Sequence, residues 1–191
     1  MFKVSNRDSQ HIAAATMLPG IVLSMYWFMN TKHTQQYLAC LSYIIVCLGS
    51  IMYHLRCSED QEFTYHPKWF RLDISCQQLL NFALASSTPY GIGGGLVILP
   101  LIVLVICTDF ADIDTYKFSM MSHASCFIIS SWLLDKQICL QWLLSIYIFN
   151  YIDGYRKTLY GTLSQSIWHL MVHWNLNAVF RGCTNLYIKI K

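Results

Sequence analysis

Charged residues divide the chain into long apolar windows. Six windows contain no Asp, Glu, Lys or Arg, and they cover residues 9–31, 33–55, 74–108, 118–134, 137–152 and 158–180. A helix needs about 20 mostly apolar residues to cross a bilayer. Inside lipid, helices keep every backbone hydrogen bond within one segment. The pattern therefore predicts membrane-spanning helices.

The window 74–108 is too long for one helix. It contains PYGIGGG at 89–95, and proline followed by clustered glycine favours a turn. Splitting it there predicts an all-α, polytopic seven-transmembrane-helix bundle, in which the whole chain, residues 1–191, forms a single domain. The expected helices cover approximately 11–30, 36–55, 73–88, 93–108, 117–134, 137–152 and 160–180.

Composition supports an integral membrane protein. Hydrophobic residues make up 55% of the chain and charged residues 12%, about half the charged share of a soluble domain. The net charge of +3 is small and scattered, which argues against nucleic acid as a partner. The eight cysteines form no CxxC pair and lie mostly in apolar windows. Packing is therefore a better explanation for them than a disulfide framework.

Polar side chains interrupt the apolar windows at a few positions. Ser50 and His54, in the stretch GSIMYH, are four residues apart and share a face of the second expected helix. Asp73 stands at the start of the third. Ionisable residues inside a membrane are costly and usually line a cavity or a site.

The last expected helix carries the stretch QSIWHLMVHW. Gln165, His169 and His173 follow one another at intervals of four residues and share one face. Since successive helices alternate in direction, this face begins on the same side of the membrane as His54 and Asp73. We therefore expect these polar groups to converge.

Convergent imidazoles beside a carboxylate predict a zinc site, because catalytic zinc takes three protein ligands and one water. His54 and His169 are the expected ligands. Asp73 would orient or deprotonate the water, and Ser50 would donate a hydrogen bond. Structural roles are the alternatives: His54 at a helix dipole, Asp73 as a cap, and His173 as a hydrogen-bonded packing residue.

The order of these motifs resembles the CREST superfamily. Ser-x-x-x-His ends the second helix, Asp begins the third, and His-x-x-x-His lies in the seventh. That group includes alkaline ceramidases, adiponectin-type receptors, GPI-anchor lipid-remodelling proteins and myomaker. The resemblance implies a seven-helix membrane fold, bound Zn²⁺, and hydrolysis of a ceramide amide or of a glycerolipid or GPI ester.

The third motif departs from the pattern of the superfamily. Aligned through Ser166 and Trp168, Gln165 replaces the first histidine, and glutamine is a poor zinc ligand. Aligned through His169 and His173, both histidines are kept but Trp168 is displaced. His173 lies about 6 Å further along the helix than His169, so it serves as the third ligand only if the metal is shifted.

Three functions follow from this reading. The first is an intramembrane zinc lipid hydrolase, expected in an ER or Golgi-type membrane, whose activity the glutamine would impair. The second is a catalytically degenerate accessory subunit of a larger membrane complex, for example in an organellar inner membrane. The third is a receptor or membrane-remodelling protein that keeps the metal for structure. The expected partners are membrane lipid and, for the second function, other membrane subunits.

Overall fold

The computed structural model describes residues 6–59, 67–88, 90–107, 124–126, 128–153 and 163–190. Within these ranges the chain is helical and contains no strand, which confirms the all-α fold class. Seven helices are α1 (Asn6–Ala15), α2 (Leu18–Asn30), α3 (Thr34–Glu59), α4 (Pro67–Ser86), α5 (Ile92–Cys107), α7 (Lys136–Asp153) and α9 (Ser164–Ile190). The short apolar segment Ala124–Leu134 is also helical. The rest of the helix expected at 117–134 lies outside the described residues.

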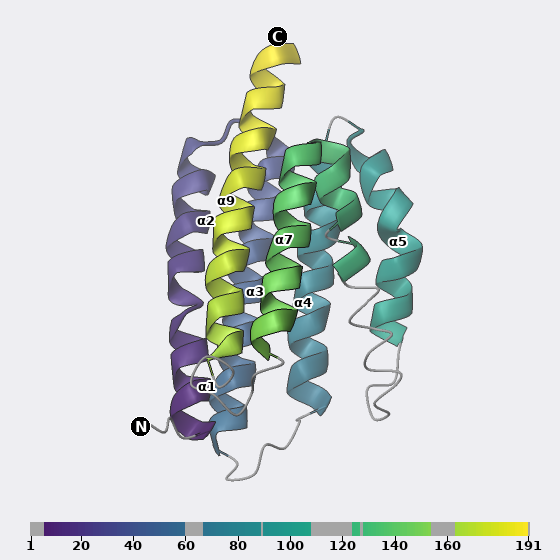
Figure 1. Cartoon of the computed structure of the whole chain (residues 1–191). Helices are drawn as coiled ribbons and strands as arrows, with labels where there is room; N and C mark the ends of the chain where they lie inside the picture. The colour runs from purple at the N-terminus through teal and green to yellow at the C-terminus, as the bar shows by residue number, and fades with distance from the viewer. Residues whose placement is uncertain are drawn as a thin grey trace.

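The helices form one upright bundle (Figure 1). Helices α1 and α2 stack end to end along one side, and α3, α4, α5, the segment Ala124–Leu134, α7 and α9 alternate in direction beside them. Helix α3 packs against α1, α2 and α4; helix α9 packs against α1, α2 and α7. This alternation places the end of α3 and the beginnings of α4 and α9 at the same end of the bundle as α1 (Figure 1).

Turn and cap residues set the helix boundaries. Helix α4 ends at Ser86 and α5 begins at Ile92, with Gly91 at a φ of 57° between them. Such a positive φ suits glycine, so the predicted division of the long apolar window is confirmed. At the start of α7 the Asp135 carboxylate accepts a hydrogen bond from the Gln137 N–H at 2.6 Å. Helix α9 continues to Ile190, beyond the expected end at 180.

The first expected helix is interrupted. The chain makes a turn at Thr16–Met17, and α2 then begins with Pro19 in its first turn. Proline has no N–H to donate to the preceding helical turn. The interruption therefore separates α1 from α2, although the stretch Arg7–Asn30 remains nearly continuous.

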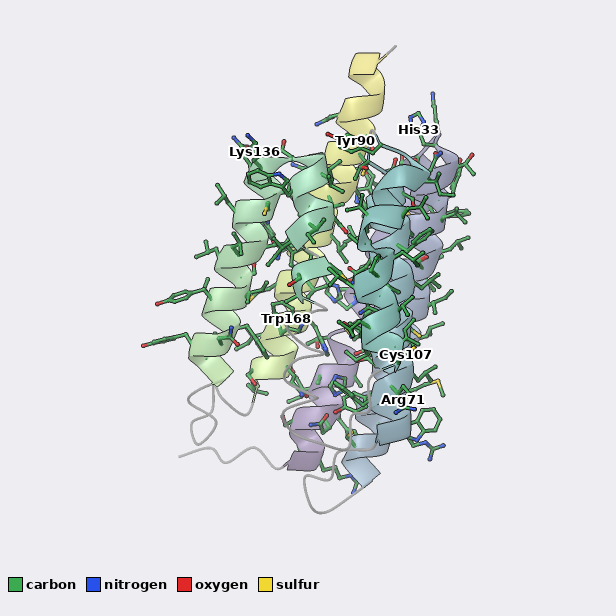
Figure 2. All side chains as sticks on the ribbon, turned by 90° about the vertical axis from the view of Figure 1, so that its right-hand side faces the viewer. His33, Arg71, Tyr90, Cys107, Lys136 and Trp168 are labelled. Atoms are coloured by element: carbon green, nitrogen blue, oxygen red, sulfur yellow. The ribbon has the colours of Figure 1, made fainter. Side chains whose placement is uncertain are left out.

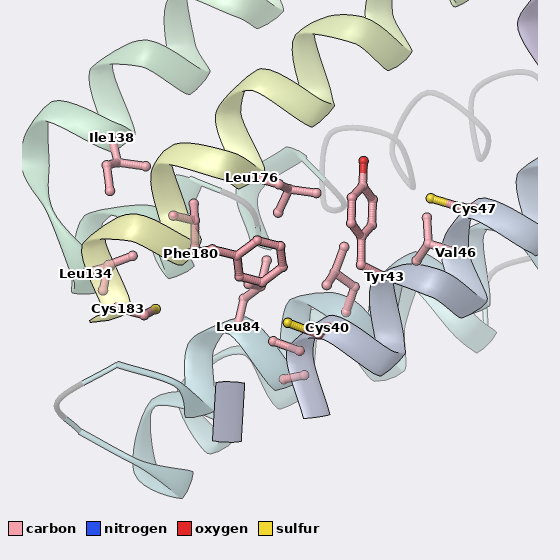
Figure 3. Packing of buried hydrophobic residues seen from close by; sticks show 14 of the residues in the cluster. Cys40, Tyr43, Val46, Cys47, Leu84, Leu134, Ile138, Leu176, Phe180 and Cys183 are labelled. Atoms are coloured by element: carbon pink, nitrogen blue, oxygen red, sulfur yellow. The ribbon is translucent and has the colours of Figure 1, made fainter. Parts of the chain in front are cut away.

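A hydrophobic cluster fixes the middle of the bundle (Figure 3). Tyr43 and Cys40 from α3, Leu84 from α4, and Leu176 and Phe180 from α9 are all buried in it. All eight cysteine thiols are free. The cysteines in this cluster therefore act as small apolar packing residues, as the sequence predicts.

The outer surface of the bundle is strongly apolar, while its interior is rich in polar groups. Exposed side chains include Val22, Met29, Val97 and Leu140, each more than 60% exposed. Buried side chains include Gln10, Gln36, Gln78 and Asn175, each below 5%. Figure 2 shows the outward side chains along the length of the bundle. Two stretches, Arg7–Asn30 and Thr34–Cys57, are long and apolar enough to cross a membrane.

Candidate functional site

The turn between α1 and α2 releases two backbone carbonyl groups. The Met17 N–H bonds to the Ala14 oxygen at 3.1 Å, three residues back, so the Ala13 carbonyl loses its usual helical donor. The Gly20 N–H bonds to the Met17 oxygen at 3.1 Å, so the Thr16 carbonyl loses its donor in the same way. Buried carbonyls of this kind need other partners.

The Thr16 hydroxyl donates to the Ala13 oxygen at 2.7 Å, and two histidines of α9 supply further partners. The His169 Nδ1 lies 3.0 Å from the Ala13 oxygen and 3.0 Å from the Thr16 hydroxyl oxygen. The His173 Nε2 lies 2.6 Å from the Thr16 carbonyl oxygen. The spacing of the two histidines therefore matches the spacing of the two released carbonyls, and α9 is hydrogen-bonded to the turn.

The second ring nitrogen of His173 is also occupied. Its Nδ1 is hydrogen-bonded to the buried Tyr43 hydroxyl. Because Nε2 donates to a carbonyl, Nδ1 carries no proton and accepts from the tyrosine. Both ring nitrogens of His173 are thus engaged in hydrogen bonds, and its role as a metal ligand stays a prediction.

His169 instead faces His54. The Nε2 atoms of the two imidazoles lie 3.4 Å apart, and both residues are buried. The Nδ1 of His54 is 2.6 Å from the amide oxygen of Gln10. Both Nδ1 atoms thus point at oxygen acceptors and carry the protons. The Nε2 atoms of the two rings therefore face one another.

Two imidazole nitrogens 3.4 Å apart can share a proton in an N–H···N hydrogen bond or bind one cation between them. Two imidazoles on one tetrahedral zinc, each with a bond of about 2.0–2.1 Å, have nitrogens about 3.3–3.4 Å apart. The separation of the His54 and His169 Nε2 atoms fits that value. Hydrogen bonds from the other ring nitrogen to an oxygen are the usual support of metal-bound histidines, and Gln10 and Ala13 provide them.

Asp73 lies on α4 with one carboxylate oxygen unused. Its Oδ2 accepts a hydrogen bond from the Gln77 amide at 3.1 Å, while Oδ1 is buried with no partner among the described residues. A Cβ added to Gly49 would lie 3.9 Å from the Asp73 Cα, so α3 and α4 are in close contact beside Ser50, which is buried. No hydrogen bond within the described part joins Asp73 to either imidazole.

The remaining candidate is Gln165, one turn before His169. It is half-buried, and its neighbour Ser166 has a buried hydroxyl with no hydrogen-bond partner in the described ranges. Considering described residues alone, no three His, Cys, Asp or Glu side chains form a group that could hold a metal ion. The structure therefore brings together the histidine pair, and the third ligand position stays a prediction.

Sequence reasoning missed the contribution of α1. Gln10 and Thr16 orient the two imidazoles. Both are isolated polar residues in an apolar window and belong to no motif that would predict this role. The available signal was Pro19, which predicts a break in the first helix and hence released carbonyls nearby. Comparison of the chain with protein-family models, curated proteins and solved structures finds no match.

Proposed function

We propose that the chain is an integral membrane protein in which seven helical rods, α1 and α2 together forming the first, cross the bilayer. The apolar exterior and polar interior support this, because soluble monomers rarely expose large contiguous apolar surfaces. In the bilayer the outward leucine, valine and methionine side chains contact lipid. Polar side chains inside membranes face the bundle interior, as the buried glutamines do here.

We propose further that the histidine pair binds zinc in a lipid hydrolase related to the CREST superfamily. The single observation that carries the proposal is the 3.4 Å separation of the His54 and His169 Nε2 atoms. When bound there, zinc would supply an activated water and polarise a substrate carbonyl. The substrate class is a ceramide amide or a glycerolipid or GPI ester.

The chain's own residues would then divide the remaining tasks. Gln10 and the Ala13 carbonyl hold the imidazoles in the tautomer that presents Nε2. The unused Oδ1 of Asp73 would accept the proton of the water, since a general base needs a free lone pair. Ser50, one turn before His54, would donate a hydrogen bond to the reacting carbonyl.

A catalytically degenerate accessory subunit is the second candidate. The observation that favours it is the engagement of both His173 ring nitrogens by Tyr43 and Thr16. With glutamine at 165, the pair would then lack a third strong protein ligand. Such a protein would keep the fold and serve within a larger membrane complex.

Elemental analysis of the purified full-length protein tests these alternatives. We expect about one zinc per chain, lost in His54→Ala and in His169→Ala. His33→Ala is the matched control, since His33 stands at the opposite end of the bundle, and it should keep its zinc (Figure 2). Release of fatty acid from ceramide or phospholipid should depend on the same two histidines.

Any different outcome of the zinc and activity measurements favours another function. Absence of zinc in protein that is correctly inserted would refute the hydrolase and favour the accessory subunit, whose copurifying subunits could then be identified. Stoichiometric zinc without turnover of either lipid class would favour a receptor or remodelling protein with a structural metal.

A further inference from the structure

A groove lined by both polar and apolar side chains lies between α7 and α9, away from the histidine pair. It has a volume of about 340 Å³, and its polar lining consists of Gln141 from α7 with Asn177, Arg181 and Asn185 from α9; Trp174 is also part of the lining. These two helices run side by side (Figure 1). Arg181 follows His169 by twelve residues, a rise of about 18 Å along α9. The groove is therefore a separate site toward the other end of the bundle.

One polar group of the groove is a buried hydrogen-bond donor that lacks an acceptor. The Gln141 Nε2 is buried and has no partner among the described residues. The Asn177 Oδ1 accepts from the Trp27 indole at 3.0 Å, which fixes the amide and leaves its Nδ2 to donate into the groove. Arg181 is exposed, and no hydrogen bond or ion pair of its side chain is found within the described ranges.

No carboxylate lines the groove. A guanidinium and several amide donors together favour a ligand with negative charge and many acceptor oxygens, and arginine suits phosphate in particular. A buried donor without an acceptor is unfavourable, so a ligand oxygen that reaches Gln141 would relieve that cost.

Exposed apolar side chains also occur on the same two helices. Trp174 is 72% exposed, and Leu140, Leu144 and Leu170 are each more than half exposed. A tryptophan beside a polar site, with leucines extending away from it, is typical of the boundary between headgroups and acyl chains. A ligand that fits both parts has a phosphate at one end and hydrocarbon at the other.

We propose that this groove binds the headgroup phosphate of an anionic phospholipid, with its acyl chains along the leucines of α7 and α9. The site goes beyond the proposed hydrolase, since it lies away from the histidine pair and requires no metal. Its role is to hold one lipid at a fixed place on the bundle.

Native mass spectrometry of the full-length protein in detergent micelles tests the proposal. The probes are phosphatidylglycerol, phosphatidylcholine and inorganic phosphate, each titrated separately. We expect phosphatidylglycerol to bind with a stoichiometry of one and Arg181→Gln to weaken it about tenfold, the effect of one lost charge-assisted hydrogen bond. Gln141→Leu, which removes a donor that has no protein partner, should weaken it roughly threefold.

Lys136→Gln is the matched control. It removes one positive charge at the same end of the bundle, where the ammonium lies 5.2 Å from the Trp132 ring and outside the groove. Equal loss of lipid in Lys136→Gln and Arg181→Gln would overturn the proposal in favour of general surface charge. Binding of inorganic phosphate alone, or equal binding of phosphatidylcholine, would overturn it as well.

The outcome is independent of the hydrolase. Loss of zinc in His54→Ala with lipid still bound would leave the groove assignment intact. If wild-type protein retains zinc but binds no phosphatidylglycerol, the proposed lipid site is overturned and the zinc site is not.

Discussion

The Nε2–H of His173 donates to the carbonyl oxygen of Thr16 across 2.6 Å, joining positions that are 157 residues apart in the chain. The carbonyl is one of the two released by the turn between α1 and α2, and it has no other donor of comparable geometry. His173 therefore acts as a structural hydrogen-bond donor, and this role can be separated from metal binding.

His173→Leu should destabilise the protein by about 1–3 kcal/mol, because the partly buried Thr16 carbonyl would lose its donor and the buried Tyr43 hydroxyl would lose its imidazole acceptor. Zinc content should not change, since both ring nitrogens of His173 are engaged in hydrogen bonds. Thermal unfolding followed by circular dichroism in detergent, with zinc analysis on the same samples, measures both. His173→Gln, which keeps a side-chain donor, should recover part of the loss. Loss of zinc in His173→Leu at unchanged stability would contradict this role.

Gly20→Ala should destabilise the same contact from the opposite side. A Cβ on Gly20 would lie 2.6 Å from the His173 Cε1 and 2.7 Å from the Cys47 sulfur. Overpacking of this kind costs about 1–3 kcal/mol. Gly93→Ala in α5 is the control, because its Cβ would meet nothing within 4 Å; helix propensity should make it neutral or slightly stabilising. Equal melting temperatures for the two variants would show that α2 and α9 are not packed as described.

Gln10→Leu should weaken zinc binding by about 10- to 100-fold, the usual effect of losing an outer hydrogen bond to a metal-bound histidine. The substitution removes the acceptor 2.6 Å from the His54 Nδ1 and leaves the ring free to rotate. Competition with a chelator of known affinity provides the measurement. Gln137→Leu, at the exposed start of α7, should keep the wild-type affinity.

Asp73→Asn should separate catalysis from folding. The substitution keeps the shape of the side chain and removes a buried charge whose Oδ1 has no partner in the described part, so the free energy of unfolding should stay equal or rise. Lipid hydrolysis should fall by at least about 100-fold, the contribution of a general base. A fully active Asp73→Asn enzyme would exclude the carboxylate from the chemistry.

The sequence was sufficient to predict the all-α fold class and the proximity of His54 and His169. Charge-free windows marked the helical segments, and alternation of direction placed His54 and His169 at one end, where the structure brings their Nε2 atoms together. The windows did not reveal the break at Thr16–Met17, because apolar composition is the same in a continuous and in an interrupted helix. They also did not show that Gln10 reaches His54, since that contact depends on how α1 is rotated against α3.

The assignment of His173 shows the limit of spacing arguments. Histidines four residues apart share a helix face, and spacing alone does not tell whether the second one meets a metal or a backbone carbonyl. The deciding feature lies in another helix, where Pro19 interrupts the regular hydrogen bonds. Only the three-dimensional arrangement connects His173 with the break at Pro19.

The released carbonyls of the α1–α2 turn link two distant parts of the gene. In a chain with another residue than proline at position 19, α1 and α2 would form one continuous helix. The Thr16 carbonyl would then have its usual helical donor, and a histidine at position 173 would no longer be required. We therefore expect substitutions at these two positions to occur together in related chains, with either single change appearing as the unstable intermediate.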